Sequence, residues 1–85
     1  MSFEFSYDRQ PLKFLKKCDK QIAERLIDKI EDSLSINPVP HNATTIVGEH
    51  GVFRIRIGDF RVIYRINYEQ NIIVIIKIDK RDRVY

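Results

Sequence analysis

Four arginines in the second half of the chain recur at a spacing that could bind phosphate. They stand on either side of a Gly-Asp pair, two residues apart before it and four residues apart after it: Arg54, Arg56, Arg61 and Arg65. Arginine presents a planar fork of donors that matches phosphate oxygens, and it stays charged at any working pH. Fixed cations can also stabilise charge that develops on a reacting phosphate. The segment therefore predicts a site for a phosphate-bearing ligand.

A tight hairpin is predicted to bring these arginines together. Residues 53–57 alternate apolar and polar side chains, which is typical of a half-buried strand, and residues 60–67 are predicted to form the second strand. Gly58, between them, can supply the positive φ that the first central position of a type II′ turn requires. We therefore expect two antiparallel strands joined by a two-residue turn.

The register of this hairpin decides which side chains share a face. If Ile57 pairs with Phe60, Arg56 lies directly opposite Arg61, and all four arginines share one side of the sheet. The other side is then apolar and is predicted to be the core: Phe53, Ile55, Ile57, Phe60, Val62 and Tyr64. Like charges directly opposite are normally destabilising, so the pair favours a bound anion such as phosphate. The alternatives are that the pair splays apart or is bridged by Asp59 or Asp82.

The N-terminal part of the chain predicts a strand followed by a helical hairpin. Residues 3–7 alternate apolar and polar side chains, as a half-buried strand does. Asp8 and Asp19 each suit a helix N-cap, and the two prolines in residues 37–40 end the second helix near Ile36. The predicted buried positions are Leu12, Phe14 and Leu15 in the first helix, which runs to about residue 17, and Ile22, Ala23, Leu26, Ile27, Ile30 and Leu34 in the second.

A loop and a third strand complete the predicted fold. Residues 41–51 read as a loop with room for a short strand at 44–47. Residues 72–78 form a strand whose apolar run suggests cover on both faces, and a shift of one residue would move Lys77 between faces. Residues 79–85 read as a charged tail. The predicted fold class is α+β, with an N-terminal strand, a helical hairpin and a three-stranded antiparallel meander in one domain over residues 1–85.

Charge is distributed unevenly along the sequence. Residues 1–51 hold seven basic and eight acidic groups, whereas residues 52–85 hold eight basic and four acidic groups. The chain ends in a basic cluster with a phenol: Lys80, Arg81, Arg83 and Tyr85. Cations hold a nucleic-acid backbone and aromatic rings stack on its bases, so this pattern favours single-stranded nucleic acid as a partner.

Conventional metal and acid–base sites are not supported by the sequence. His41 and His50 stand nine residues apart in the predicted loop, and Cys18 is the single cysteine. We therefore expect no metal and no cofactor. The longest apolar run, residues 72–76, is far shorter than the roughly 20 residues of a membrane span, and the N-terminus lacks the pattern of a signal peptide. A cytoplasmic protein without a membrane partner is predicted.

Two segments carry a family resemblance. The run FRIRIGDFRVIYR, residues 53–65, closely resembles the hallmark meander of the RelE/ParE toxin superfamily, and IDKRDRVY, residues 78–85, resembles its closing segment. Length, helical hairpin and strand order agree, so the resemblance covers nearly the whole chain. It implies a RelE-like compact fold and the toxin of a type II toxin–antitoxin system. It also implies a hetero-oligomer with a RelB-like antitoxin protein.

The RelE branch of this superfamily implies a specific reaction. Its members cleave mRNA in the ribosomal A site by attack of a 2′-OH on the scissile phosphate, with the ribosome and mRNA as partners. By position, Arg61 matches the arginine that stabilises that phosphate, Arg81 matches the one that assists the leaving 5′-oxygen, and Tyr85 matches the tyrosine that orients the base. The remaining cations are predicted to bind RNA: Arg56, Arg65, Lys80 and Arg83.

One departure from the family pattern affects the predicted chemistry. Arg54 stands where well-studied members have a lysine. We predict that Arg54 is nevertheless one of the catalytic residues. Since arginine does not lose its proton, it cannot act as a general base. The base would then be Lys80, Tyr85 or a ribosomal group, or positioning alone would carry the reaction. The competing predictions are a ParE-like inhibitor that acts by binding DNA gyrase, and a catalytically weak homologue that only binds RNA or its partner.

Overall fold

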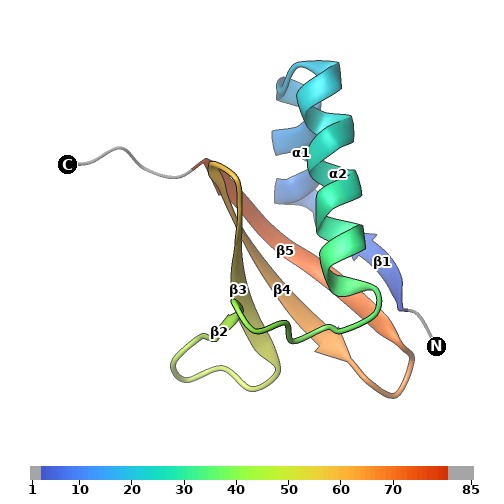
Figure 1. The fold of residues 1–85 in the computed structure, drawn as a ribbon, viewed down its shortest axis with the longest axis vertical. Helices are drawn as coiled ribbons and strands as arrows, with labels where there is room; N and C mark the ends of the chain where they lie inside the picture. The colour runs from blue at the N-terminus through green and yellow to red at the C-terminus, as the bar shows by residue number, and fades with distance from the viewer. Residues whose placement is uncertain (1–2, 81–85) are drawn as a thin grey trace.

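Two helices and five strands make up the part of the chain that the computed structural model describes, residues 3–80 (Figure 1). In chain order they are β1 (Glu4–Tyr7), α1 (Arg9–Lys17), α2 (Lys20–Leu34), β2 (Thr44–Thr45), β3 (Val52–Ile57), β4 (Phe60–Asn67) and β5 (Ile72–Lys80). The predicted α+β class is confirmed. No helix within residues 3–80 is long and apolar enough to cross a membrane.

All five strands belong to one sheet, in the order β1-β5-β4-β3-β2. The antiparallel meander of β3, β4 and β5 is as predicted, and the strand expected within 44–47 is the two-residue β2. β1 adds to the far edge and runs parallel to β5, with Phe5 opposite Ile73. The predicted meander is therefore the centre of a wider sheet, and its third strand lies in the interior between β1 and β4.

The β3–β4 hairpin has the predicted register. Ile57 pairs with Phe60, Arg56 with Arg61, and the turn between them opens on Gly58 with a φ of +58°. An L-side chain rarely adopts this backbone conformation, so glycine is favoured there. The apolar set predicted for the opposite face is also confirmed, because each member is either buried in the core or packed against it.

A β-bulge divides β5 into two halves with different side-chain alternation. Tyr64 of β4 pairs with Ile75, but its neighbour Ile63 pairs with Lys77, so Ile76 is the extra residue. Before the bulge Ile73 and Ile75 are buried, and after it the next buried residue of β5 is Ile78. Without the extra residue, strict alternation would place Lys77 and Asp79 in the core. The bulge moves both charged side chains to the arginine side, and the strand continues to Lys80 instead of ending at residue 78.

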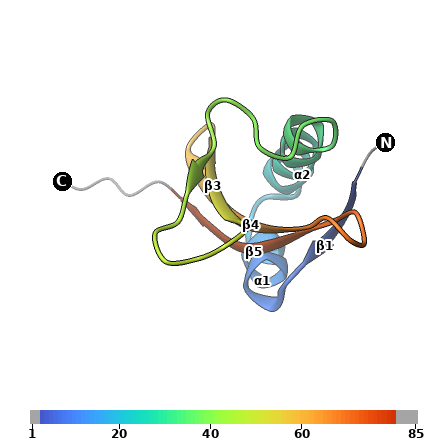
Figure 2. The same ribbon diagram turned by 90° about the horizontal axis from the view of Figure 1, so that it is seen from below.

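The helical hairpin begins and ends close to the predicted residues. Asp19 caps α2 by accepting a hydrogen bond from the backbone N–H of Gln21 at 3.2 Å, whereas Asp8 precedes α1 without such a side-chain bond. In Figures 1 and 2, α1 lies next to β5, and α2 runs beside α1. The first turn of α1 accommodates Pro11, which is buried.

Two apolar residues predicted to be buried are instead exposed, so those predictions were wrong. Leu12 is 51% exposed and Ile22 is 44% exposed. The face of α2 that reaches the sheet is the stripe of Leu26, Ile30 and Leu34, and Ile22 lies one turn before it. Helical periodicity identified the apolar stripe but not where the partner surface ends.

Tyr64 and Tyr7 show how the core satisfies its polar atoms. The Tyr64 hydroxyl donates to the carbonyl of Pro38 at 2.7 Å, which fastens the loop after α2 onto β4. Burial, with a smaller contribution from the nearby Tyr68, raises the pKa of Tyr64 to about 12. The Tyr7 hydroxyl donates to the Glu31 carboxylate at 2.8 Å, and burial followed by that carboxylate raises its pKa too. No buried side-chain polar atom lacks a partner within the described residues.

Candidate nucleic-acid interface

Three of the four predicted arginines line a single cavity. Its volume is about 450 Å³ and its walls are Asn42, Thr44, Arg54, Arg56 and Arg61. β3 and β4 supply the arginines, and β2 contributes Thr44, which pairs with Arg54 at the edge of the sheet. We call this the arginine cavity. Guanidinium, amide and hydroxyl donors on one concave surface are suited to phosphate oxygens.

The arginines of this cavity form no ion pair with a carboxylate in the described part of the chain. Arg56 faces Arg61 directly across the hairpin, and no ion pair joins either of them to a carboxylate of residues 3–80. The proposed bridge through Asp59 is therefore absent, whereas Asp82 lies outside the described residues. Arg61 is partly buried while Arg54 and Arg56 are exposed, so Arg61 is the more firmly placed cation. Such a surface attracts an anion from solution.

A second cavity adjoins the first and adds groups of a different chemistry. It measures about 290 Å³ and is lined by Ile46, Arg54, Arg61, Ile63, Lys77 and Asp79. Arg54 and Arg61 line both cavities, so the two are neighbours on one face of the sheet. Lys77 Nζ lies 3.5 Å from Asp79 Oδ2, and Asp79 stands directly opposite Arg61 in the β4–β5 register. We call this the lysine–aspartate cavity.

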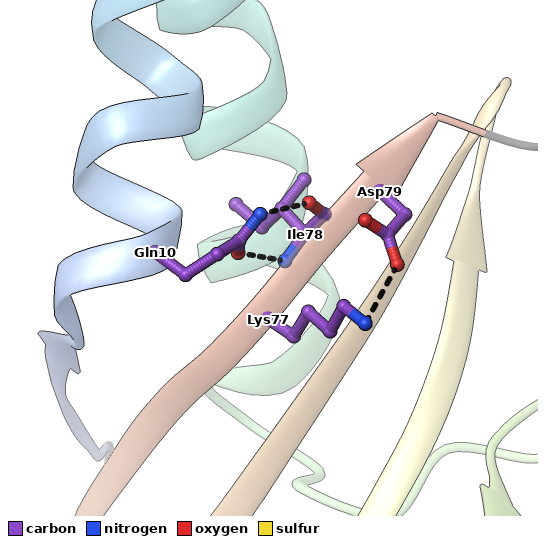
Figure 3. A network of polar contacts seen from close by, with 4 residues as sticks. All are labelled: Gln10, Lys77, Ile78 and Asp79. Atoms are coloured by element: carbon purple, nitrogen blue, oxygen red, sulfur yellow. Dashed lines mark hydrogen bonds and ion pairs between the residues drawn. The ribbon is translucent and has the colours of Figure 1, made fainter.

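Gln10 fixes the stretch of β5 that carries this charged pair. Its side-chain amide donates to the Ile78 carbonyl and accepts from the Ile78 N–H, both at 2.9 Å, so it pairs with β5 as a neighbouring strand would. β1 ends at Tyr7, opposite Ile75, and beyond that point Gln10 hydrogen-bonds the edge of β5 that β1 does not pair with. Figure 3 shows Gln10 approaching from the side of α1 while Lys77 and Asp79 extend on the other side of β5.

Neither Gln10 nor Asp79 was predicted for the site from the sequence. A glutamine in the first turn of a helix has no local feature that indicates a bond to a strand 68 residues away. Asp79 was assigned to the charged tail, and the face of Lys77 was left open. The sequence carries no signal for the bulge, because residues 72–76 are all apolar and leave the side-chain alternation of β5 undefined before Lys77.

The other predicted site residues lie apart from the two cavities or outside the described residues. Arg65 shares the arginine face but stands four positions along β4 from Arg61, about 13 Å at the usual strand rise. Lys80 pairs with Phe60 on the opposite face and lines a cavity between α2 and the β3–β4 turn. Arg81, Arg83 and Tyr85 lie outside the described residues.

Metal-binding groups are not gathered in this region. Across residues 3–80, no three His, Cys, Asp or Glu side chains come together as a set that could hold a metal ion. The predicted loop histidines, His41 and His50, are both exposed. What the described site offers is cationic and hydrogen-bonding chemistry together with one lysine–carboxylate pair.

Comparison with known proteins relates this fold to a class of small toxins. Residues 5–85 match the family model described as ParE toxin of type II toxin–antitoxin system, parDE. A curated protein of Methanocaldococcus jannaschii, whose name describes it as a candidate toxin RelE1, is 34% identical over 88 aligned positions, which cover 100% of this chain and 97% of that protein.

Solved structures of related toxins have the same architecture. The archaeal RelE–RelB complex from Pyrococcus horikoshii contains a chain 29% identical to this one, with a TM-score of 0.78 over 99% of this chain and 100% of that one. The RelBE2 toxin–antitoxin complex of Mycobacterium tuberculosis gives a TM-score of 0.81 at 24% identity, over 95% of this chain and 100% of that one, a likeness of fold alone. The chain belongs to the ParE toxin family, within the RelE/ParE superfamily, and is a RelE-like toxin of a type II toxin–antitoxin system.

Proposed function

We propose that this toxin is a ribosome-dependent endoribonuclease that cleaves mRNA in the ribosomal A site. The observation that carries the proposal is the arginine cavity, in which Arg54, Arg56 and Arg61 line one concave surface and none of them is ion-paired to a carboxylate of residues 3–80. Holding three like charges together is unfavourable unless an anion occupies the site. An RNA phosphate supplies that anion.

In this proposal the arginines act on the phosphate and the ribosome shapes the substrate. Attack of a 2′-OH on the adjacent phosphate gives a 2′,3′-cyclic phosphate and a 5′-OH, and negative charge grows on the phosphate oxygens during the reaction. Arg61 is the partly buried cation and is assigned to stabilise that charge, with Arg54 and Arg56 holding the backbone beside it. Tyr85 keeps the role of orienting the base, and Arg81 keeps that of assisting the leaving 5′-oxygen through its positive charge, as the family resemblance implies.

A second function, inhibition of DNA gyrase by binding, has one observation in its favour. The family model that matches residues 5–85 is that of ParE toxins, whereas the curated relative carries a RelE name. A gyrase inhibitor needs the scaffold but not a set of cations that act on a phosphate. The arginine cavity therefore favours RNA cleavage, and a supercoiling assay separates the two proposals.

The decisive experiment adds the purified toxin to translating ribosomes and maps the ends of the mRNA. We expect new ends within the A-site codon, and Arg61→Ala should reduce their rate of formation by about 100- to 1,000-fold, as removal of one transition-state donor does. Lys17→Ala, which removes an exposed cation at the end of α1, serves as the control. Intact mRNA together with inhibited supercoiling would reverse the assignment in favour of gyrase.

The proposed partner is a RelB-like antitoxin that covers the toxin in a hetero-oligomer. The related Pyrococcus horikoshii toxin was solved as a RelE–RelB complex. In this chain, exposed Leu12 lines a groove of about 630 Å³ between α1 and α2 that is edged by three cations: Arg9, Lys13 and Lys16. An acidic, amphipathic segment would complement such a groove. Toxicity on expression, relieved by co-expression of a neighbouring small reading frame, would identify this partner, and a ribosomal target would place the toxin in the cytoplasm.

A further inference from the structure

The lysine–aspartate cavity contains the two proton-exchanging side chains that line the same space as Arg54 and Arg61. Cleavage through a 2′-OH requires one proton to leave the nucleophile and one to reach the departing oxygen. Arginine remains protonated and cannot accept a proton. Lysine and aspartate can both exchange one, and Lys77 and Asp79 stand 3.5 Å apart.

We propose that Lys77 and Asp79 are the proton-transfer pair of the RNA cleavage proposed above, on which this inference rests. The 2′-oxygen forms its bond to phosphorus as the Asp79 carboxylate takes the hydroxyl proton. The bond between phosphorus and the 5′-oxygen breaks as the Lys77 ammonium gives that oxygen a proton. A proton then crosses from the Asp79 carboxyl to the Lys77 amine, and both groups return to their starting states without a further reactant.

The geometry of β5 places this pair where the reaction requires it. The bulge at Ile76 moves Lys77 and Asp79 to the arginine side, and Asp79 faces Arg61 across the strands. Their side chains are 52% and 43% exposed, so a substrate can reach both. Bulges are over-represented beside active sites because they redirect side chains without breaking the sheet. Here the bulge separates a buried Ile75 from the charged pair that follows it.

Two further features suit an RNA substrate at this position. Ile46 and Ile63 line the same cavity, and their apolar side chains offer a surface for a ribose or a base next to the phosphate held by Arg61. Gln10 clamps both backbone groups of Ile78, the residue between Lys77 and Asp79, and so restrains the strand that carries them. Restraint of this kind keeps reacting groups in a productive geometry. Lys80, the base candidate from the sequence, lines a different cavity on the other face.

The test measures cleavage and RNA binding separately in conservative variants. Lys77→Arg keeps the positive charge but cannot donate a proton readily, and Asp79→Asn keeps the size but removes the acceptor. We expect each to lower the single-turnover cleavage rate on programmed ribosomes by about 100- to 10,000-fold. Binding to ribosomes carrying mRNA with a 2′-deoxy residue at the cleaved nucleotide should remain at the level of the parent toxin.

Controls distinguish proton transfer from folding or charge. Lys20→Arg makes the same chemical change at an exposed position in the first turn of α2 and should cleave at the parental rate. Asp79→Glu restores a carboxylate and should recover part of the rate lost in Asp79→Asn. Matching thermal midpoints would establish that the variants are folded.

Three results would overturn the inference. If Lys77→Arg cleaves at the parental rate, Lys77 is not the proton donor. If a variant loses as much binding to the 2′-deoxy complex as it loses cleavage, the pair only contacts the RNA. In either case the proposed function survives, because the parent toxin still cleaves. A parent toxin that leaves mRNA intact would instead overturn the proposed function and this inference together.

Discussion

The two faces of the β3–β4 hairpin are built from alternate residues of the same strands and have opposite properties. One face carries Ile55, Val62 and Tyr64, which are at most 2% exposed and lie in a core with no buried unsatisfied side-chain atom among the described residues. The other carries the arginines of the arginine cavity, including a like-charged pair directly across the strands. Stability is concentrated on the first face and binding chemistry on the second.

This separation follows from the two-residue repeat of a strand. A substitution on one face changes no side chain of the other, so stability and ligand affinity can vary independently. β5 contributes to both faces as well, and its bulge places Lys77 and Asp79 on the arginine side. The predictions below test whether the two faces are independent, starting with the largest expected change in stability.

The largest effect is expected in the core. Ile30 is fully buried on α2, and Ile30→Ala should lower the free energy of unfolding by about 2–5 kcal/mol through lost burial and the cavity left behind. Chemical denaturation measures this change. Affinity for RNA should be unchanged at temperatures where the variant is still folded. A folded Ile30→Ala protein with weakened RNA binding would contradict the independence of the faces.

The Gln10 clamp should come next, because it serves both the edge of β5 and the charged pair beside it. Gln10→Leu leaves the N–H and carbonyl of Ile78 without their partner, which should cost about 1–3 kcal/mol. Gln21→Leu makes the same change at an exposed position of α2 and should stay within about 0.5 kcal/mol of the parent. Equal stability of the two variants would show that the clamp contributes nothing.

Alkaline pH should weaken the core through Tyr64. Its pKa is about 12 in the folded chain against about 10 when unfolded, so the folded state holds the phenolic proton more tightly. The stabilisation is fully present below pH 10 and is lost as the pH rises toward 12. Tyr64→Phe should flatten this decline, which is measured as the free energy of unfolding against pH. A part of the decline should remain in the variant, because the pKa of Tyr7 is also raised. An unchanged slope would contradict the assignment.

The smallest change in stability is expected on the arginine face, and it is a stabilisation instead of a loss. Arg56→Thr removes one member of the like-charged pair and should stabilise the free toxin by about 0.2–1 kcal/mol at low salt. The gain should largely disappear at about 1 M salt, where the Debye length is only about 3 Å. Thermal unfolding at two salt concentrations checks this, and a destabilised variant would indicate that the two guanidinium groups are not in conflict.

The sequence by itself determined the register of the β3–β4 hairpin and therefore the arginine face. Alternation of two residues and a turn that favours Gly58 leave one arrangement that buries the apolar set, so local information is sufficient. The limits of the helical hairpin follow from Asp19 and the prolines after α2 in the same way.

Only the tertiary structure decided the parts that depend on distant pairing. The parallel addition of β1 to β5, the bond from Gln10 to Ile78 and the exposure of Leu12 each depend on which segments meet. The bulge in β5 belongs to this group as well, since it exists only relative to β4, and it transfers Lys77 and Asp79 to the arginine side. Local periodicity describes one segment at a time, whereas these features arise from free energy gained when two segments pack together.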